Sequence, residues 1–250
     1  MSKDINNIKQ LITALEPVQA LKVLAETYPG KVIFSTSFGW EDQVITHMIF
    51  ANKLPIKVFT LETGRLFPET YYTWSRTLEI YGQPIHAYYP QAAAVEKMVS
   101  TKGPSSFYES VENRKECCAI RKIEPLKRAL TGNEIWITGI RADQSVNREH
   151  MENIEWDEGN QLTKFHPIFA WTLDDVKQYI KQYNIPYNPL HDKGFPSIGC
   201  APCTRAVREG EDFRAGRWWW EDQSKKECGL HVTEAHDDHE EVFFEGNEQN

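Results

Sequence analysis

Cysteines are the residues of this chain whose number and spacing could do chemistry. Four of the five form two pairs, Cys117-Cys118 and Cys200-Ala201-Pro202-Cys203, whereas Cys228 stands alone near the C-terminal end. An odd number of clustered cysteines is untypical of a secreted disulfide framework and typical of metal ligands or redox catalysts. We therefore expect the paired thiolates to hold a cofactor and the fifth thiol to be free to react.

The two pairs differ in what their spacing allows. A structural zinc site draws two ligands from each C-x₂₋₄-C knuckle, a pattern that Cys200 and Cys203 fit and Cys117-Cys118 does not. Neighbouring side chains diverge, so both sulfurs of the adjacent pair reach one ion only with a strained backbone. A four-iron cluster offers each thiolate its own iron and accepts the wider spread. Spacing alone leaves zinc and an iron–sulfur cluster open.

The charge of the chain restricts what it could bind. Lys and Arg number 28 against 36 Asp and Glu, which gives a formal charge of −8. Such a balance argues against a nucleic-acid surface, because that surface must neutralise phosphates along a basic face. Basic residues nevertheless gather close in sequence to the cysteines, among them Lys122, Arg214 and Arg217. A small basic pocket in an acidic protein suits a small anion better than a polymer.

The sequence also bears on cellular location. No apolar run approaches the roughly 18 residues that a membrane span needs. The first residues, Met1-Ser2-Lys3-Asp4-Ile5-Asn6, lack the basic and apolar regions of a signal peptide. We therefore expect a cytoplasmic protein with no membrane partner.

Short apolar segments alternate with helical patterns along most of the chain. The strands are predicted at 31–35, 57–61, 85–89 and 134–139, and the helices at 5–15, 17–28, 41–50, 69–81, 92–100, 119–130 and 172–183. This alternation predicts an α/β fold, a parallel sheet with helices on both faces. We divide the chain into N-terminal helices (1–30), an α/β domain that binds nucleotide and cluster (31–204), and an Arg-rich segment with a mobile, flexible C-terminal arm (205–250).

Three turns follow predicted strands, at 35–42, 61–68 and 139–148. In open parallel sheets, ligands bind beyond the carboxyl ends of the strands, so these turns are candidate binding loops. The first, Ser35-Thr36-Ser37-Phe38-Gly39-Trp40-Glu41-Asp42, has hydroxyls and a glycine at a helix start, where backbone N–H groups can cradle a phosphate. It matches neither the Walker A pattern nor GxGxxG.

The second turn carries a resemblance to a known family. Its string L-E-T-G-R-L-F-P-E-T (61–70) resembles the L-D-T-G-x-L-F-P-E-T signature of the reductases of activated sulfate, which act on adenylyl sulfate (APS) or its 3′-phosphorylated form (PAPS). Glu62 stands where the family usually has Asp. G-I-R-A-D-Q-S (139–145) resembles the family's G-x-R-x-x-Q-S, and E-C-G-L-H (227–231) resembles its nucleophile motif. The resemblance covers roughly 31–231.

The resemblance implies an adenine nucleotide alpha hydrolase-like fold and an activity. Cluster-bearing APS reductases carry a C-C pair and a C-x-x-C, which the cluster-free PAPS reductases lack. By this resemblance Cys117, Cys118, Cys200 and Cys203 would hold one [4Fe–4S] cluster per chain. Cys228 would attack the sulfur of APS and expel AMP, and thioredoxin or glutaredoxin would then release sulfite from the S-sulfocysteine, a step of sulfate assimilation and cysteine biosynthesis.

The same resemblance assigns residues to the site. The catalytic set is Cys228, Lys122, His231, Arg214 and Arg217. The substrate-binding set is Ser35, Ser37, Gly39, Glu41, Leu61, Thr63, Gly64, Arg65 and Arg141. Lys122 follows the cysteine pair closely and could lie near both cluster and substrate. The run Trp218-Trp219-Trp220 is expected to be core or subunit interface rather than a thioredoxin surface, and a homo-oligomer is left open.

Three alternatives to an APS reductase remain at this stage. The enzyme could reduce PAPS, or both nucleotides. It could be a sulfur-inserting or ATP-pyrophosphatase enzyme of the same fold, although 38–42 departs from the S-G-G-x-D-S loop expected there. The chain could also belong to another class, as a zinc-binding module without enzymatic activity. Its acidic charge argues against RNA as the partner of such a module.

Overall fold

The computed structural model describes residues 2–144 and 151–221, and its centre is one six-stranded sheet. The strands are β1 (Val32–Ser35), β2 (Lys57–Leu61), β3 (His86–Tyr88), β4 (Ile135–Ile137), β5 (Ile154–Asp157) and β6 (Leu162–Phe165), in the order β3-β2-β1-β4-β6-β5. Every neighbouring pair is parallel except β5 with β6. In the centre, Phe34 lies opposite Val58 of β2 and Ile137 of β4. The predicted parallel sheet is confirmed.

The antiparallel hairpin of β5 and β6 was not predicted. The hairpin is difficult to predict from the sequence, because charged residues occupy positions that are buried in the fold. Lys164 is 1% exposed, donates to Asp157 at 2.9 Å and lies over the ring of Trp136. A buried lysine is tolerated only when it is paired, so hydropathy does not mark this segment as a strand.

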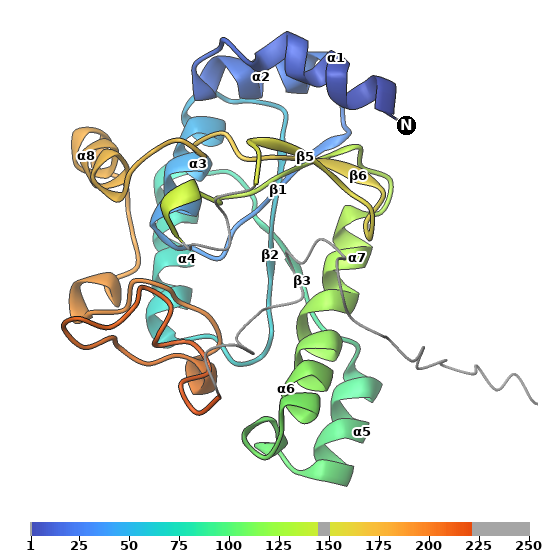
Figure 1. Ribbon diagram of the computed structural model, residues 1–250, viewed down its shortest axis with the longest axis vertical. Helices are drawn as coiled ribbons and strands as arrows, with labels where there is room; N and C mark the ends of the chain where they lie inside the picture. Colours follow the sequence, from blue (N-terminus) through green and yellow to red (C-terminus); the bar gives the residue numbers. More distant parts are fainter. Residues whose placement is uncertain (1, 145–150, 222–250) are drawn as a thin grey trace, which may run out of the picture.

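Helices cover both faces of the sheet, as predicted, and Figure 1 shows α3 and α8 on one side and α7 on the other. The larger core joins β-strand residues such as Phe34 and Ile137 to α2, α3 and α8. The opposite faces of the same strands, with Ile33 and Trp136, pack against α7. The helices are α1 (Ser2–Ile12), α2 (Pro17–Thr27), α3 (Trp40–Ala51), α4 (Pro68–Tyr81), α5 (Ala92–Lys102), α6 (Val111–Cys118), α7 (Glu124–Leu130) and α8 (Leu173–Tyr183).

Local signals explain where two of these helices begin. Pro68 lies in the first turn of α4, where its missing N–H has no partner to lose. The predicted capping box of α8 is present: the Thr172 hydroxyl accepts from the amide of Asp175, whose carboxylate accepts from the amide of Thr172.

The adjacent cysteines lie inside a helix rather than before one, which corrects the prediction of a helix that starts at 119. Cys117 and Cys118 end α6, and the chain continues without a break through a π-helical turn, η2 (Ala119–Ile123), into α7. Within this turn the amide of Glu124 donates to the carbonyl of Ala119. Pro125 accounts for the wider turn, because proline has no N–H for an α-helical bond and its ring crowds the preceding turn.

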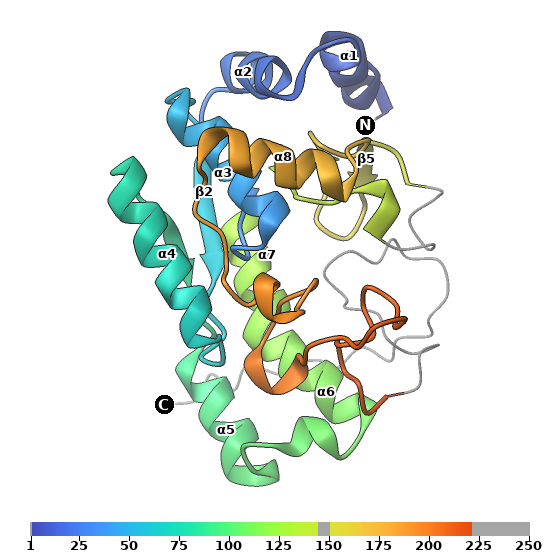
Figure 2. The same ribbon diagram turned by 90° about the vertical axis from the view of Figure 1, so that its left-hand side faces the viewer.

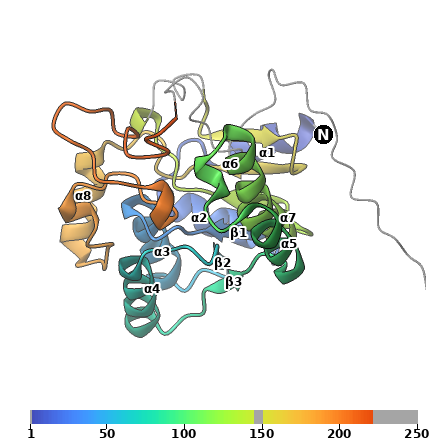
Figure 3. The same ribbon diagram turned by 90° about the horizontal axis from the view of Figure 1, so that it is seen from below.

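The order of the strands creates a crevice at one edge of the sheet. From β1 the chain moves outward through β2 and β3, whereas β4 lies on the other side of β1. Loops that leave β1 and β4 therefore separate, and such switch points are where ligands bind in α/β sheets. The sheet lies between the two helical layers when seen along its edge (Figure 3), and the segment after α8 returns beside α6 (Figure 2).

In the two described ranges, no helix is both long enough and apolar enough to cross a membrane. Cys228 and His231, with the rest of 222–250, lie outside the described residues, as does the end of the third turn with Arg148.

Candidate functional site

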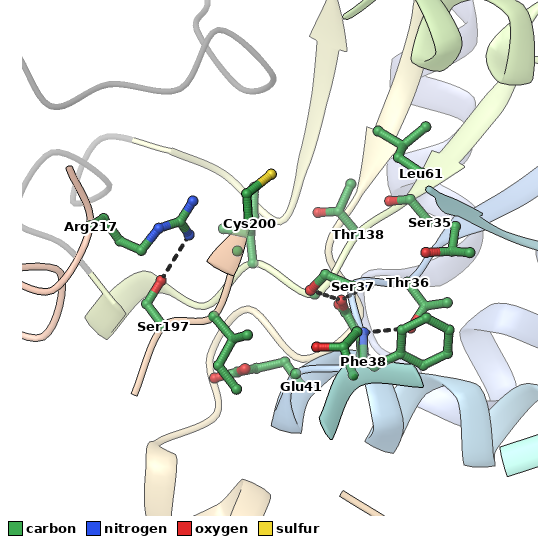
Figure 4. Close-up of a pocket in the computed structure, with 18 of the residues that line it drawn as sticks. Ser35, Thr36, Ser37, Phe38, Glu41, Leu61, Thr138, Ser197, Cys200 and Arg217 are labelled. Carbon is green, nitrogen blue, oxygen red and sulfur yellow. Dashed lines mark hydrogen bonds between the residues drawn. The ribbon is translucent and has the colours of Figure 1, made fainter. Parts of the chain in front are cut away.

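A cavity of about 260 Å³ opens at the carboxyl ends of β1, β2 and β4, where the three turns were expected to meet. It has hydroxyl groups on the strand side, and Arg217, Ser197 and Cys200 lie across from Ser35 and Leu61 (Figure 4). We call it the nucleotide pocket, after the ligand that the resemblance implies. Ten of the predicted site residues line it: Ser35, Ser37, Gly39, Glu41, Leu61, Thr63, Lys122, Cys200, Arg214 and Arg217.

The first turn presents the start of α3 to this pocket. Gly39 is the N-cap, and none of the described side chains caps the helix. Phe38 has a φ of 63°, which turns the chain sharply, and it is held there by the stacked ring of Trp74 and by a bond from its amide to the Thr36 hydroxyl at 3.1 Å. Uncapped amides at a helix N-terminus attract anions. The turn is therefore built to take a negatively charged group.

A carboxylate already occupies part of the same turn. Oδ2 of Asp42 accepts from the amide of Ser37 at 2.6 Å and from its hydroxyl at 2.7 Å. On the other side of the carboxylate a Cβ on Gly139 would lie 2.3 Å from Oδ1, so only glycine fits there. Burial raises the pKa of Asp42 to about 6, although the bonds from Ser37 oppose the rise and the neighbouring Glu41 adds to it.

Glu41 lies beside the pocket and pairs with an arginine behind it. Arg141 is 1% exposed and donates from Nε to Glu41 at 2.9 Å. The same guanidinium also pairs with Asp143. Arg141 therefore does not line the pocket in this structure, and its role in binding substrate stays a prediction.

Two residues of the second turn also lie elsewhere. Gly64 has a φ of +71°, as its place in the turn predicts, and does not line the nucleotide pocket. Arg65 lies over the ring of Phe107 at 5.2 Å and donates to the carbonyl of Pro104, which places it at the cysteines instead. Their binding roles likewise stay predictions.

The wall opposite the strand ends includes residues 196–199, for which the sequence predicted no role in the site. Ser197 accepts from Arg217 at 3.4 Å, and a Cβ on Gly199 would lie 2.2 Å from the guanidinium of Arg217. Glycine at this position thus leaves the space that the arginine fills. Nε of Arg217 is buried without a hydrogen-bond partner among the described residues.

Other lining residues were also not predicted. Thr138 follows β4 directly, so the strand-end rule would have found it. His191 has no such signal. Its ring stacks on Trp40 with centroids 3.8 Å apart, and its Nδ1 donates to the carbonyl of Phe195 at 2.7 Å. Burial lowers the pKa of His191 to about 4, so this imidazole stays neutral.

A second, smaller cavity lies next to the pocket, and we call it the cysteine cavity. All four paired cysteines line it as free thiols, and Lys122 and Cys200 line both cavities. Thr63 joins the two sites, since its hydroxyl lies 3.3 Å from the Cys200 sulfur and its carbonyl accepts from Arg121 at 2.6 Å. The other residues of the cavity are Arg65, Phe107, Arg114, Arg121, Pro202 and Trp218.

The thiols of the cavity differ in their tendency to ionise. Burial raises the pKa of Cys117, and burial together with the nearby Cys200 raises that of Cys203 to about 12. For Cys200 burial would also raise the pKa, but Lys122, the hydrogen bond to Thr63 and the charge of Arg217 outweigh it and lower the value. Cys200 is thus the thiol that the surrounding cations favour as a thiolate.

A buried ion pair closes the cysteine cavity. Arg114 lies one helical turn before the cysteine pair and donates from Nε and Nη2 to the two carboxylate oxygens of Glu221, each at 2.9 Å. Both side chains are nearly fully buried, and the Arg114 guanidinium lies 4.6 Å from the ring of Trp218. Trp218 is 1% exposed, as expected for a core residue, whereas Trp219 is 39% exposed.

The donor set of the cavity fits an iron–sulfur cluster. Four thiols around one cavity are the ligands that such clusters use, and the lining cations Arg65, Arg121 and Lys122 would offset part of the charge of four thiolates. Within residues 2–144 and 151–221, no three Cys, His, Asp or Glu side chains are arranged to bind a single metal ion.

Comparison with solved structures agrees with this architecture. A phosphoadenylyl-sulfate (PAPS) reductase from Candida auris, in a phosphate complex, superposes with a TM-score of 0.70 and 28% identity, covering 83% of this chain and 98% of that one. An FMN adenylyltransferase from Candida glabrata, bound to FAD and pyrophosphate, superposes with a TM-score of 0.52 over 90% of this chain and 76% of that one. At 15% identity the second shares the fold alone, a mostly parallel sheet with helices on both sides.

Sequence comparison identifies the family. An adenosine 5′-phosphosulfate reductase of Burkholderia cepacia is 48% identical over 90% of this chain and 90% of its own. A protein of the same name from Allochromatium vinosum is 50% identical over 81% of this chain and 79% of its own. The model of the phosphoadenosine phosphosulfate reductase domain matches residues 31–206. The chain belongs to the phosphoadenosine phosphosulfate reductase family.

Proposed function

We propose that this protein reduces adenylyl sulfate to sulfite and AMP, with thioredoxin or glutaredoxin as reductant, in the cytoplasm. The observation that carries the proposal is that two neighbouring cavities share residues of their walls. A pocket at the switch point of an adenine-nucleotide fold shares Lys122 and Cys200 with a cavity lined by four thiols. Relatives named for this activity are 48% and 50% identical over most of the chain.

The pocket suits the two ends of a sulfonucleotide. The amides at the start of α3 would bind the phosphate, because helix N-termini attract anions. Lys122, Arg214 and Arg217 would face the sulfate, since all three line the pocket. Fixed cations are needed there because a thiolate and a phosphosulfate repel one another in the transition state.

Cys117, Cys118, Cys200 and Cys203 would hold the [4Fe–4S] cluster, one sulfur to each iron. When bound, the cluster would supply charge beside Lys122, which lines both cavities. The covalent steps below move electron pairs between sulfur and oxygen or between sulfur atoms, and they need no electron from the cluster.

The reaction would take two nucleophilic steps. In the first, the Cys228 thiolate attacks the sulfur of APS, a sulfur–sulfur bond forms, and the sulfur–oxygen bond breaks with its electron pair leaving on AMP. In the second, a thiolate of the reductant attacks the Cys228 sulfur, and sulfite leaves with the electron pair of the sulfur–sulfur bond. The second thiol of the reductant then resolves the mixed disulfide. His231, three residues after Cys228, would help to keep that thiol ionised.

Reduction of PAPS is the second candidate. The observation in its favour is the structural likeness to the Candida auris enzyme, whose name states PAPS. Its identity of 28% is well below the 48% and 50% of the relatives named for APS. We therefore place APS first.

The proposal is tested with protein purified without oxygen. Iron and sulfide are quantified, and sulfite is measured with reduced thioredoxin and either APS or PAPS. We expect about four irons per chain, as in a [4Fe–4S] cluster, and sulfite from APS at a higher kcat/KM than from PAPS. The matched variant Cys228→Ser should keep the iron and lose sulfite formation. Sulfite from neither nucleotide would overturn the proposed function, and full activity of the variant would overturn the assignment of the nucleophile.

A further inference from the structure

Asp42 is an acidic residue in a place that should favour anions. It stands in the first turn of α3 and lines the pocket whose uncapped helix N-terminus attracts negative charge. A phosphosulfate that enters this pocket must approach the Asp42 carboxyl. Two like charges in one partly buried site disfavour each other, and one of them is neutralised by a proton when one can be taken up.

Hydrogen bonds hold the carboxyl of Asp42 in its place beside the pocket. Ser37 binds Oδ2 through both its amide and its hydroxyl, at 2.6 and 2.7 Å. Oδ1 lies close to Gly139, where an added Cβ would stand 2.3 Å from that atom. Because these bonds oppose a movement of the side chain, a change in its charge state is the simpler response to a nearby anion.

Among the residues that the structure describes, few charged groups line the pocket together with Asp42. Glu41, its neighbour on α3, raises the pKa of Asp42 and is itself paired with Arg141. From the other elements around the pocket, Lys122, Arg214 and Arg217 line the same space, and His191 is neutral. The influences on the pKa of Asp42 are its burial, the bonds from Ser37 and the charge of Glu41. The nucleotide would pair the three cations with its own charges.

We infer that Asp42 is a positioning residue that takes up one proton from solvent as the anionic part of the nucleotide enters, so that substrate binding and protonation of this carboxyl are coupled. This inference rests on the proposed function. In the protonated form, Asp42 still accepts from Ser37 through one oxygen and gains an O–H donor. The turn therefore keeps its shape while the pocket loses one negative charge.

The coupling fixes the direction of a pH dependence. In the free protein the pKa of Asp42 is about 6, and the bound anion raises it further. Between the free and the bound pKa, binding takes up a proton, so affinity falls as pH rises, by about tenfold per pH unit at most for one proton. Below the free pKa, Asp42 is protonated in both states and affinity no longer depends on its titration.

The test is calorimetric titration of APS into the full-length chain carrying Cys228→Ser, which prevents turnover. APS is chosen because its phosphosulfate does not titrate in this range, whereas the phosphate of AMP has a pKa of about 6. Titrations at about pH 7 in two buffers of different ionisation enthalpy give the number of protons taken up. We expect uptake of a fraction of a proton up to one per APS, and a dissociation constant that rises with pH.

Asp42→Asn keeps an oxygen for Ser37 and cannot take up a proton. It should bind APS without proton uptake and with an affinity that does not change with pH. The control is Asp174→Asn, an exposed carboxylate on α8 outside the pocket, which should behave as the parent does. Ser37→Ala removes one bond that lowers the pKa of Asp42, so proton uptake should move to higher pH. If Asp42→Asn does not fold, this second variant tests the inference in its place.

The outcomes separate the two levels of the argument. APS binding without proton uptake by the parent, or unchanged uptake by Asp42→Asn, overturns the role of Asp42 alone. No APS binding by any variant at any pH overturns the proposed function and this inference with it.

Discussion

The nucleotide pocket and the cysteine cavity share a wall but are built by different means. The pocket is made largely of loops at strand ends, and its lining combines hydroxyl groups and glycines with apolar side chains and a few charged ones. The cysteine cavity is made of one continuous helix with a π-turn, a short C-x-x-C loop, and a shell of arginines and aromatic rings. Lys122 and Cys200 belong to both.

This difference separates a surface that must open from one that must stay closed. Strand-end loops expose backbone amides, so a ligand can enter, bind and leave. The cysteine cavity is held shut by the Arg114–Glu221 pair, whose two side chains are 2% and 3% exposed. A buried pair of this kind is costly to break, because the partner that remains is an uncompensated charge. A substitution in the cysteine cavity should therefore mainly lower stability, whereas one in the nucleotide pocket should mainly lower the affinity for substrate.

The largest expected effect is on the stability of the cysteine cavity. Arg114→Ala leaves the carboxylate of Glu221 buried without its partner, and this should lower the free energy of unfolding by about 3–5 kcal/mol. Urea unfolding measures it. The matched control is Arg76→Ala, whose pair with Glu79 is exposed at 43% and 66% and should cost about 0.2–1 kcal/mol. Equal losses in the two variants would contradict the account of how this cavity is closed.

A smaller effect is expected from the shared wall of the nucleotide pocket. In Gly199→Ala the new methyl group would meet the guanidinium of Arg217 at 2.2 Å and displace it. Loss of one charge-assisted contact should weaken APS binding by about 10- to 100-fold, with little change in stability. Gly159→Ala, whose methyl group would make only an ordinary contact at 3.5 Å, is the control. Unchanged affinity in Gly199→Ala would remove Arg217 from the binding surface.

Much of the fold and of the pocket follows from local pattern. The central strands are apolar runs bounded by turns. Residues at or just after their carboxyl ends, such as Ser35, Leu61 and Thr63, converge because parallel strands end at one edge. The gathering of the four cysteines follows the resemblance to the family, and the structure brings them to one cavity.

What pattern could not supply depends on contacts between distant segments. Lys164 is a poor residue for a buried strand until Asp157 and Trp136 lie beside it. The π-turn was not predicted, because the apolar pattern of the helical run does not show how Pro125 widens the turn before it. Arg141 lies behind the pocket because Glu41, far away in sequence, pairs with it there. Propensity and periodicity contain no information on such pairs.

The most direct test of the central claim is a single turnover without reductant. Protein purified without oxygen is mixed with APS alone, AMP is quantified, and each cysteine-containing peptide is examined by mass spectrometry. The proposed chemistry predicts one AMP released per active chain and the mass of one SO₃ group on the peptide that contains Cys228. AMP release without this adduct, or the adduct on any of the four paired cysteines, would contradict it.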